Sequence, residues 1–232
     1  MARRGRVIVF LGPIGVGKST TIRGLTQELR ARGFRTYTIF IKSFHGLAYV
    51  LWVLTARLLG LKKGRYAPWF MVSMSGRVNL VRGLTVLSIY LDAFFSIPLK
   101  LALTRLLRYF GYFVISEEYL NSTIFDHIYL IIDVGIRDKY VLIPLRVLGS
   151  LLNKYKPDLT IALKADLPEI WRRWIIRGYG ECQPRYVLLH ITILNKLDHS
   201  YKLAHVLYVD TSGMGVKETL HRILDVVMKH SS

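Results

Sequence analysis

The segment Gly12-Pro-Ile-Gly-Val-Gly-Lys-Ser19 constrains the fold more than any other part of this 232-residue chain. It matches the pattern Gly-x-x-x-x-Gly-Lys-Ser/Thr in full, and it lies between an apolar, β-branched run at 6–11 and a stretch of helical spacing at 18–32. Glycines let successive backbone N–H groups point inward at phosphate oxygens, and the dipole of the following helix adds attraction for an anion. The pattern therefore predicts a phosphate-binding loop between a strand and a helix.

The side chains of this loop have separate predicted roles. Lys18 is expected to lie against the β- and γ-phosphates of a nucleotide, and the Ser19 hydroxyl is expected to bind Mg²⁺. A chance glycine-rich turn is the alternative, but motif, strand and helix coincide here. The predicted nucleotide-binding residues are Gly12, Pro13, Ile14, Gly15, Val16, Gly17, Lys18, Ser19 and Thr20.

Strands alternate with helices along the rest of the chain. Runs rich in β-branched and aromatic residues predict further strands at 34–41, 112–116, 156–166 and 205–210. Helical spacing fills most of the intervals between them, including a long stretch at about 45–110 that a turn at 61–68 and Pro98 are expected to interrupt. The alternation predicts an α/β chain with the three-layer P-loop NTPase fold, in which helices flank a five-stranded parallel sheet. Without an internal repeat or linker, residues 1–232 are expected to form one domain.

Charge and hydropathy are distributed unevenly. The formal net charge is +18, yet 52% of the residues are hydrophobic. Residues 1–111 contain 18 Lys and Arg against two acidic residues, whereas the remaining residues are nearly balanced. The longest run without a charged residue, 43–56, is shorter than the roughly 18 to 20 residues that cross a bilayer, so no spanning helix is expected. With Cys182 as the one cysteine, an internal disulfide is excluded and a cytoplasmic location is expected.

Residues 195–198 indicate a second class of protein. Asn-Lys-Leu-Asp matches the Asn-Lys-x-Asp pattern with which GTPases read guanine, and Thr211-Ser-Gly resembles their next motif. The two motifs are too close for the helix and strand that normally separate them, and Asp133-Val-Gly135 is one residue short of Asp-x-x-Gly. A GTPase-like switch that uses Asn195 and Asp198 therefore remains the alternative to a kinase.

The order of motifs along nearly the whole chain resembles the thymidylate kinase family of P-loop nucleoside-monophosphate kinases. The similar segments are GPIGVGKSTTIRGLTQELRARG, RYFGYFVISEEYLNS, PDLTIALKADLPEIWRRWIIRG and VLYVDTSG. The resemblance implies a kinase that uses ATP and Mg²⁺ to phosphorylate a nucleoside monophosphate, with dTMP as the favoured acceptor. It also implies a substrate or dimer region at about 45–110 and a mobile lid at about 172–186.

The family's Asp-Arg-Tyr motif is replaced by Glu117, Glu118 and Tyr119. The resemblance implies that Glu117 acts near Mg²⁺ and that Glu118 and Tyr119 lie at the substrate. Glu118 cannot do an arginine's work, because two like charges ~4 Å apart cost about 4 kcal/mol at an effective dielectric of about 20. Three alternatives stay open: another arginine contacts the acceptor, Glu118 points away, or the acceptor is a neutral hydroxyl with Glu117 as base, as in the related deoxynucleoside kinases.

Three further stretches are compared with the family. Where it usually has an acid-and-proline motif after the second strand, this chain has Ile41-Lys-Ser-Phe44. The family's lid supplies cations to the γ-phosphate. The resemblance therefore implies a catalytic role for Arg173 and Arg177, in addition to Lys18 and Glu117. Arg172 and Arg185 lie near them in the sequence. The family binds the base by an aromatic stack and an arginine, for which the candidates are Phe70, Arg77 and Arg82.

The long helical stretch is apolar almost all round, so it must be buried against something. Packing within the domain or a homodimer interface is the favoured account. Association with an anionic membrane surface is an alternative, since Lys62, Lys63 and Arg65 lie nearby and would add about 1 kcal/mol each. No recognition motif accompanies the basic residues, so no specific nucleic-acid partner is expected.

Overall fold

The central sheet is parallel and has five strands. In this computed structural model the described residues are 5–61, 67–176, 187–192, 196 and 205–229. The strand order is β2-β3-β1-β4-β5. The strands are β1(Arg6–Leu11), β2(Thr36–Phe40), β3(Phe113–Glu117), β4(Leu159–Lys164) and β5(Val206–Asp210). Each lies at one of the five predicted positions, so the sequence-based strand assignment is confirmed.

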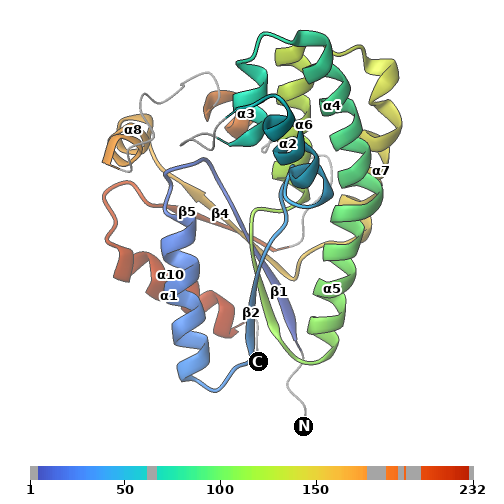
Figure 1. Cartoon of the computed structure of the whole chain (residues 1–232). Helices are drawn as coiled ribbons and strands as arrows, with labels where there is room; N and C mark the ends of the chain where they lie inside the picture. Colours follow the sequence, from blue (N-terminus) through green and yellow to red (C-terminus); the bar gives the residue numbers. More distant parts are fainter. Residues whose placement is uncertain (1–4, 62–66, 177–186, 193–195, 197–204, 230–232) are drawn as a thin grey trace.

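Helices cover both faces of the sheet (Figure 1). On one face, α1(Lys18–Ala31) and α10(Val216–Lys229) bury leucines, isoleucines and valines against β1, β3 and β4. On the other face, α5(Ile97–Tyr109), α6(Leu120–Val134) and α7(Leu142–Lys154) pack against the apolar side chains of β1, and Ile39 of β2 adjoins this cluster. A short 3₁₀ turn, η2(Asp138–Tyr140), precedes α7. Strands buried on both sides explain why their sequences are continuous apolar runs. The predicted three-layer α/β architecture is confirmed.

The stretch at 45–110 folds into four helices and one π-helical turn. They are α2(Leu47–Leu58), α3(Pro68–Ser73), α4(Val78–Leu91), the turn η1(Asp92–Ser96) and α5. Pro98 does not interrupt the helix as expected, because η1 shifts the hydrogen-bond register just before it. Pro98 comes just after this π-helical turn, where the regular i→i−4 ladder is already interrupted, so the helix continues past a residue that has no N–H.

The path through α4, η1 and α5 is therefore one helix from Val78 to Tyr109, 32 residues long. By length and composition this helix could cross a membrane. The runs without charged residues in the sequence did not predict such a helix. Of its most apolar 18-residue segment, 39% is buried inside the protein. Its inner side chains, including Ile97 and Leu101, pack under the sheet. Its outer side chains, including Phe95, Leu99 and Tyr109, are exposed.

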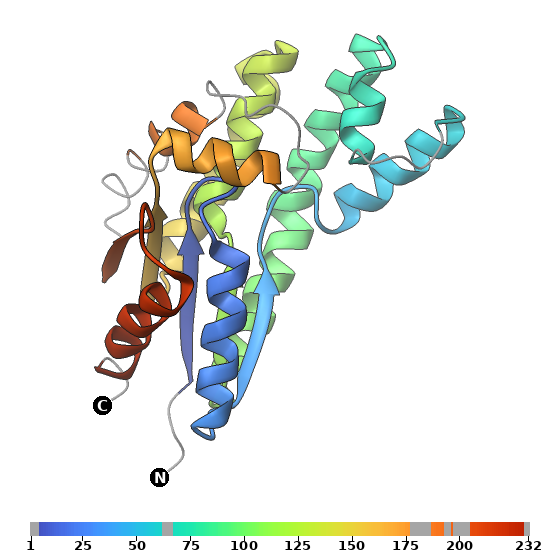
Figure 2. The same cartoon turned by 90° about the vertical axis from the view of Figure 1, so that its left-hand side faces the viewer.

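All five strands end at the same edge of the sheet because they are parallel. β1 lies between β3 and β4, with β2 and β3 on one side of it and β4 and β5 on the other. The strand order therefore reverses direction at β1, and the loop after β1 lies at this switch point. Ligands of open α/β sheets bind at this point. Figure 2 shows α8(Leu167–Ile176) lying across this end of the sheet, above the loop that joins β1 to α1.

Candidate active site

The loop after β1 requires its glycines. Gly12 has φ +141°, and a Cβ there would come within 2.4 Å of the carbonyl oxygen of Leu163 on β4. Gly17 has φ +102° and is the residue from which α1 begins. Both backbone conformations disfavour residues with a side chain. The loop therefore curls tightly over the end of the sheet and leads into the N-terminus of α1.

Lys18 is buried beneath this loop with all three of its ammonium donors engaged. Its Nζ donates to the carbonyl oxygens of Gly12, at 2.6 Å, and Pro13, at 3.1 Å. The third contact is an ion pair with Oε1 of Glu118, at 2.8 Å. Two donors hold the lysine to its own loop, so the donor directed at Glu118 is the one that a phosphate oxygen can take.

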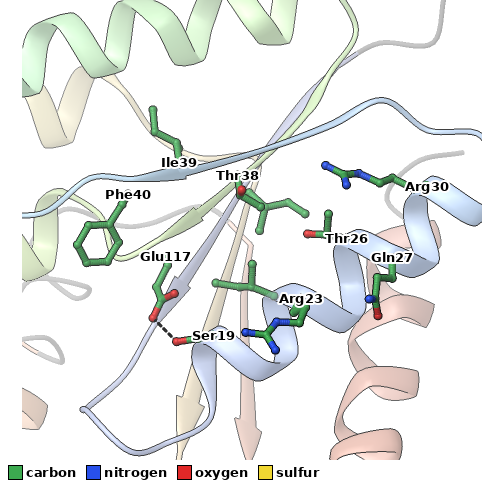
Figure 3. Close-up of a pocket in the computed structure, with 11 residues that line it drawn as sticks. Ser19, Arg23, Thr26, Gln27, Arg30, Thr38, Ile39, Phe40 and Glu117 are labelled. Carbon is green, nitrogen blue, oxygen red and sulfur yellow. Dashed lines mark hydrogen bonds between the residues drawn. The ribbon is translucent and has the colours of Figure 1, made fainter.

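Ser19 and Glu117 form the second polar contact of the site. The Ser19 hydroxyl donates to Oε1 of Glu117, at 2.7 Å, and joins the first turn of α1 to the end of β3 (Figure 3). Hydroxyl and carboxylate oxygens are ligands that Mg²⁺ accepts, and Mg²⁺ usually takes the rest of its shell from water and substrate phosphates. The pair fits a magnesium ion that binds together with a nucleotide. In the part of the chain that the structure describes, no three His, Cys, Asp or Glu side chains gather into a metal site.

Glu118 is held in a strained and buried position. Its φ is +69°, a value that non-glycine residues adopt at a cost of about 1–3 kcal/mol, and its side chain is 3% exposed. Burial alone would raise the pKa of this carboxyl, but the positive charges of Lys18 and Lys42 outweigh burial and lower it to about 2. Glu118 is therefore ionised at neutral pH, and its charge is directed at Lys18. That carboxylate, directed at Lys18, also lines the second of the cavities described below.

A cavity of about 560 Å³, which we call the Thr211 cavity, lies on one side of the loop. Arg173 of α8 closes it: its guanidinium donates to the carbonyl oxygen of Val16, at 3.3 Å, and to the Thr211 hydroxyl, at 3.0 Å. Glu169 accepts a hydrogen bond from Arg173, at 2.7 Å, and orients it. The cavity is lined by Gly15, Val16, Gly17, Thr20, Thr21, Glu169, Arg172, Arg173, Ile176, Thr211, Gly213, Met214, Gly215, Val216 and Thr219.

A second cavity of about 570 Å³, the Trp69 cavity, lies on the other side of the same loop. Both cavities touch Gly15 and Gly17. The Trp69 cavity combines charged side chains from the ends of β2 and β3 with aromatic side chains from α3. It is lined by Ile14, Gly15, Gly17, Lys18, Ser19, Phe40, Lys42, Ala67, Trp69, Phe70, Glu117, Glu118 and Trp174.

A third cavity, of about 520 Å³, lies between α1 and the edge strand β2. Figure 3 shows Arg23, Gln27 and Arg30 along α1 and the Ser19–Glu117 contact at one end of this cavity. It therefore adjoins the Ser19–Glu117 contact.

The structure brings together most of the predicted loop residues but separates the predicted substrate residues. Phe70 lines the Trp69 cavity, as its predicted role requires. Arg82 instead donates to the carbonyl oxygen of Val134, at 2.9 Å. The buried hydroxyl of Tyr119 donates to the carbonyl oxygen of Tyr155, at 2.6 Å. Arg77 is exposed at the start of α4, and neither it nor Arg82 nor Tyr119 lines the three cavities.

Several predicted residues lie outside the described part of the chain. Arg177, Arg185 and most of the lid at 172–186 belong to this group, and so do Asn195 and Asp198 of the GTPase-like motif. Asp133-Val-Gly135, by contrast, is described: it forms the C-terminal end of α6, with Gly135 in the left-handed region. A helix end on α6 is not the strand-end position of a nucleotide-binding motif.

Sequence reasoning missed five residues of the Trp69 cavity, of which Lys42 and Trp69 matter most for its chemistry; the others are Phe40, Ala67 and Trp174. Lys42 follows β2 with one residue between, so its position at the carboxyl edge of the sheet was a usable signal. Trp69 comes from a six-residue helix after a turn, and the sequence offered no signal for its placement. The two residues give the cavity a cation and an aromatic wall.

Comparison with solved structures agrees with this architecture. The chain is similar to thymidylate kinase from Candida albicans with a TM-score of 0.60 and 18% sequence identity, over 99% of this chain and 94% of that one. At this level of identity the likeness shows the fold, which is thymidylate kinase-like. No protein-family model matches the sequence, and no curated protein matches it.

Proposed function

We propose that this protein is a phosphotransferase that moves the γ-phosphoryl group of ATP, as its Mg²⁺ complex, to a nucleoside monophosphate, with dTMP as the first acceptor to test. In this reaction an oxygen of the acceptor phosphate forms a bond to the γ-phosphorus. The bond from that phosphorus to the bridging oxygen breaks, and ADP leaves with the electron pair. The thymidylate kinase-like fold supports this reaction class.

The observation that carries the proposal is the pair of cavities that meet at one phosphate-binding loop. The Thr211 and Trp69 cavities have similar volumes and share Gly15 and Gly17. Transfer between two substrates requires both of them to reach the same loop, with the reacting atoms side by side. A GTPase needs a nucleotide site and a water molecule, so a second large cavity with an aromatic wall favours the transferase.

The nucleotide that donates the phosphoryl group is assigned to the Thr211 cavity. Arg173 supplies a positive charge there and links α8 to the loop through Val16. The N-terminus of α1 faces the phosphates and attracts negative charge. Lys18 then contacts the β- and γ-phosphates with the donor that Glu118 otherwise takes.

Mg²⁺ bound with ATP would supply positive charge that neutralises the negative charge developing during transfer. Ser19 and Glu117 are the residues assigned to hold it, because their oxygens already meet at 2.7 Å beside Lys18. Glu117 also lines the Trp69 cavity. A nucleoside with a free hydroxyl is therefore a second candidate acceptor, for which Glu117 would take the hydroxyl proton.

ADP release from Mg·ATP, measured with dTMP, with other nucleoside monophosphates and with free nucleosides, tests the proposal. Faster release with a monophosphate supports the first assignment, and faster release with a nucleoside supports the second. The control is Lys18→Ala, which should abolish release with every acceptor. Release that no acceptor stimulates, combined with a preference for GTP over ATP, would favour a GTPase instead.

We further propose that the enzyme acts in the cytoplasm as a homodimer. The exposed apolar side chains of α2 and α5, including Leu54, Leu58, Leu99 and Leu106, offer a surface for a second copy.

A further inference from the structure

We propose that Lys42 is the residue that binds the acceptor's phosphate, and that the Trp69 cavity therefore selects a ligand with an anionic group at one end and an aromatic ring at the other. The inference rests on the proposed function, because it concerns the second substrate of the same reaction. It assigns to Lys42 a contact that Glu118 cannot make.

Lys42 is in the right place for this contact. It lies just beyond β2, at the edge of the sheet where β1 and β3 also end, and it lines the Trp69 cavity together with Ser19 and Glu117. An anion bound to Lys42 therefore lies in the same cavity as the magnesium-binding pair. A γ-phosphate held by Lys18 would be reached from the same cavity.

Lys42 is also the cation that remains available. The Lys and Arg side chains that line the Trp69 cavity, among the residues described, are Lys18 and Lys42. Lys18 is held by Gly12, Pro13 and Glu118, and its exchangeable donor is assigned to ATP. The carboxylate of Glu118 lines the same cavity, and Lys42 is the lysine there that still faces this charge once ATP takes the donor of Lys18.

Within the part of the chain that the structure describes, no hydrogen bond consumes the donors of Lys42. Its nearest carboxylate oxygen, Oδ2 of Asp126, is 3.8 Å away, which is beyond hydrogen-bond distance. That same oxygen accepts a hydrogen bond from the Ser43 hydroxyl, at 2.6 Å. Asp126 therefore attracts the ammonium and limits where it can go, while the N–H groups of Lys42 are left for a ligand.

The charge of Lys42 persists although four-fifths of its side chain is buried. Burial acts to lower the pKa of Lys42, but attraction to Asp126, Glu118 and Glu117 outweighs burial and raises the pKa above its ordinary value. A buried ammonium in a pocket attracts phosphate more strongly than an exposed one does, because less water screens the charge.

Part of the lining of the cavity is aromatic. Trp69, Phe70 and Phe40 line it, and Phe70 is 45% exposed. A half-exposed aromatic ring in a cavity gains contact area when a flat ligand stacks on it. The combination of an ammonium with these aromatic side chains fits a monophosphate attached to an aromatic base, and it gives a free nucleoside no partner for Lys42.

Calorimetric titration of the full chain with dTMP and with thymidine tests the inference, with and without a non-hydrolysable ATP analogue. In Lys42→Met, which keeps the length of the side chain and removes its charge, dTMP affinity should fall by about 10- to 100-fold, as expected for lost charge-assisted hydrogen bonds. Thymidine should bind within about twofold of the original protein. The control Lys139→Met removes an exposed lysine outside the three cavities and should change none of these affinities.

Lys42→Arg separates a binding role from a structural one, because it restores the charge. It should recover at least tenfold of the dTMP affinity lost in Lys42→Met.

Unchanged dTMP affinity in Lys42→Met, or equal affinity of the original protein for dTMP and thymidine, would overturn the inference. If Lys42→Met phosphorylates an acceptor with an unchanged KM, the inference fails while the kinase stands. If dTMP binding depends on Lys42 but no phosphoryl transfer occurs, the anion site stands while the proposed function fails.

Discussion

Replacing Glu118 with glutamine should weaken the folded protein and tighten its binding of ATP at the same time. Glutamine keeps the shape of the side chain and an oxygen that Lys18 can contact at the present 2.8 Å, but it removes the negative charge. Two consequences of opposite sign follow, because the same ion pair stabilises the empty site and competes with phosphate for Lys18.

The loss of stability can be worked from the pKa of Glu118. Its lowering from 4.5 to about 2 corresponds to roughly 3 kcal/mol of stabilisation, at about 1.4 kcal/mol per pKa unit. A carboxyl whose pKa is lowered on folding contributes this free energy above its unfolded-state pKa. The contribution is lost as the pH falls from about 4.5 towards 2. Glu118→Gln should therefore lower the free energy of unfolding at pH 7 by about 1–3 kcal/mol and flatten its decline in acid.

The gain in ATP affinity comes from the same contact. ATP must take the donor of Lys18 that Glu118 holds, which leaves a carboxylate with 3% exposure short of a partner. Leaving a buried charge without a partner costs about 3–5 kcal/mol, and nearby Lys42 offsets part of this cost. Glutamine carries no charge, so the Glu118→Gln variant avoids the cost and should bind ATP about tenfold more tightly or better.

Denaturant unfolding from pH 2.5 to 7 and calorimetric titration with ATP measure the two effects of Glu118→Gln. Glu28→Gln is the matched control, because Glu28 forms an exposed pair with Arg32, at 3.9 Å, and should change either quantity little. Weaker ATP binding in Glu118→Gln, or an unchanged pH dependence of stability, would show that the Glu118–Lys18 ion pair does not have this double role.

Three other substitutions test separate parts of the structure. Glu117→Gln should raise the Mg²⁺ concentration needed for half-maximal activity by about tenfold, which a kinetic Mg²⁺ titration measures. It should leave the free energy of unfolding nearly unchanged, because Glu117 contacts Ser19 at an exposed position. Leu99→Glu should convert a dimer into a monomer in sedimentation experiments, since Leu99 is 73% exposed on the proposed interface; a dimer in the variant would count against it. Trp52→Ala should cost about 3–5 kcal/mol in denaturant unfolding, because Trp52 is fully buried and donates to Ser88; a loss below about 1 kcal/mol would contradict this packing.

The fold could be predicted from the sequence because its signals are local. Strands such as Phe113–Glu117 are short apolar runs bounded by turns, and α1 follows directly from a recognisable loop. Pro98 was misjudged because the cost of a proline depends on hydrogen-bond register, and the π-helical turn that shifts the register has no sequence signature.

The site was predictable only where one segment contains both the motif and the element that positions it. Lys18 and Ser19 are of this kind. Arg82 looked like a ligand for a substrate, but its partner is a carbonyl 52 residues away on another helix. Glu118 looked like an obstacle to an acceptor, and only its backbone conformation reveals that it faces Lys18. Such contacts depend on tertiary packing, which spacing along the chain does not encode.

Whether this protein is a phosphotransferase is decided by acceptor-dependent release of ADP from Mg·ATP. We expect dTMP or another nucleoside monophosphate to accelerate the release, and Lys18→Ala to abolish it. Hydrolysis of ATP or GTP at a rate that no monophosphate or nucleoside changes would contradict the claim that this loop joins two substrates.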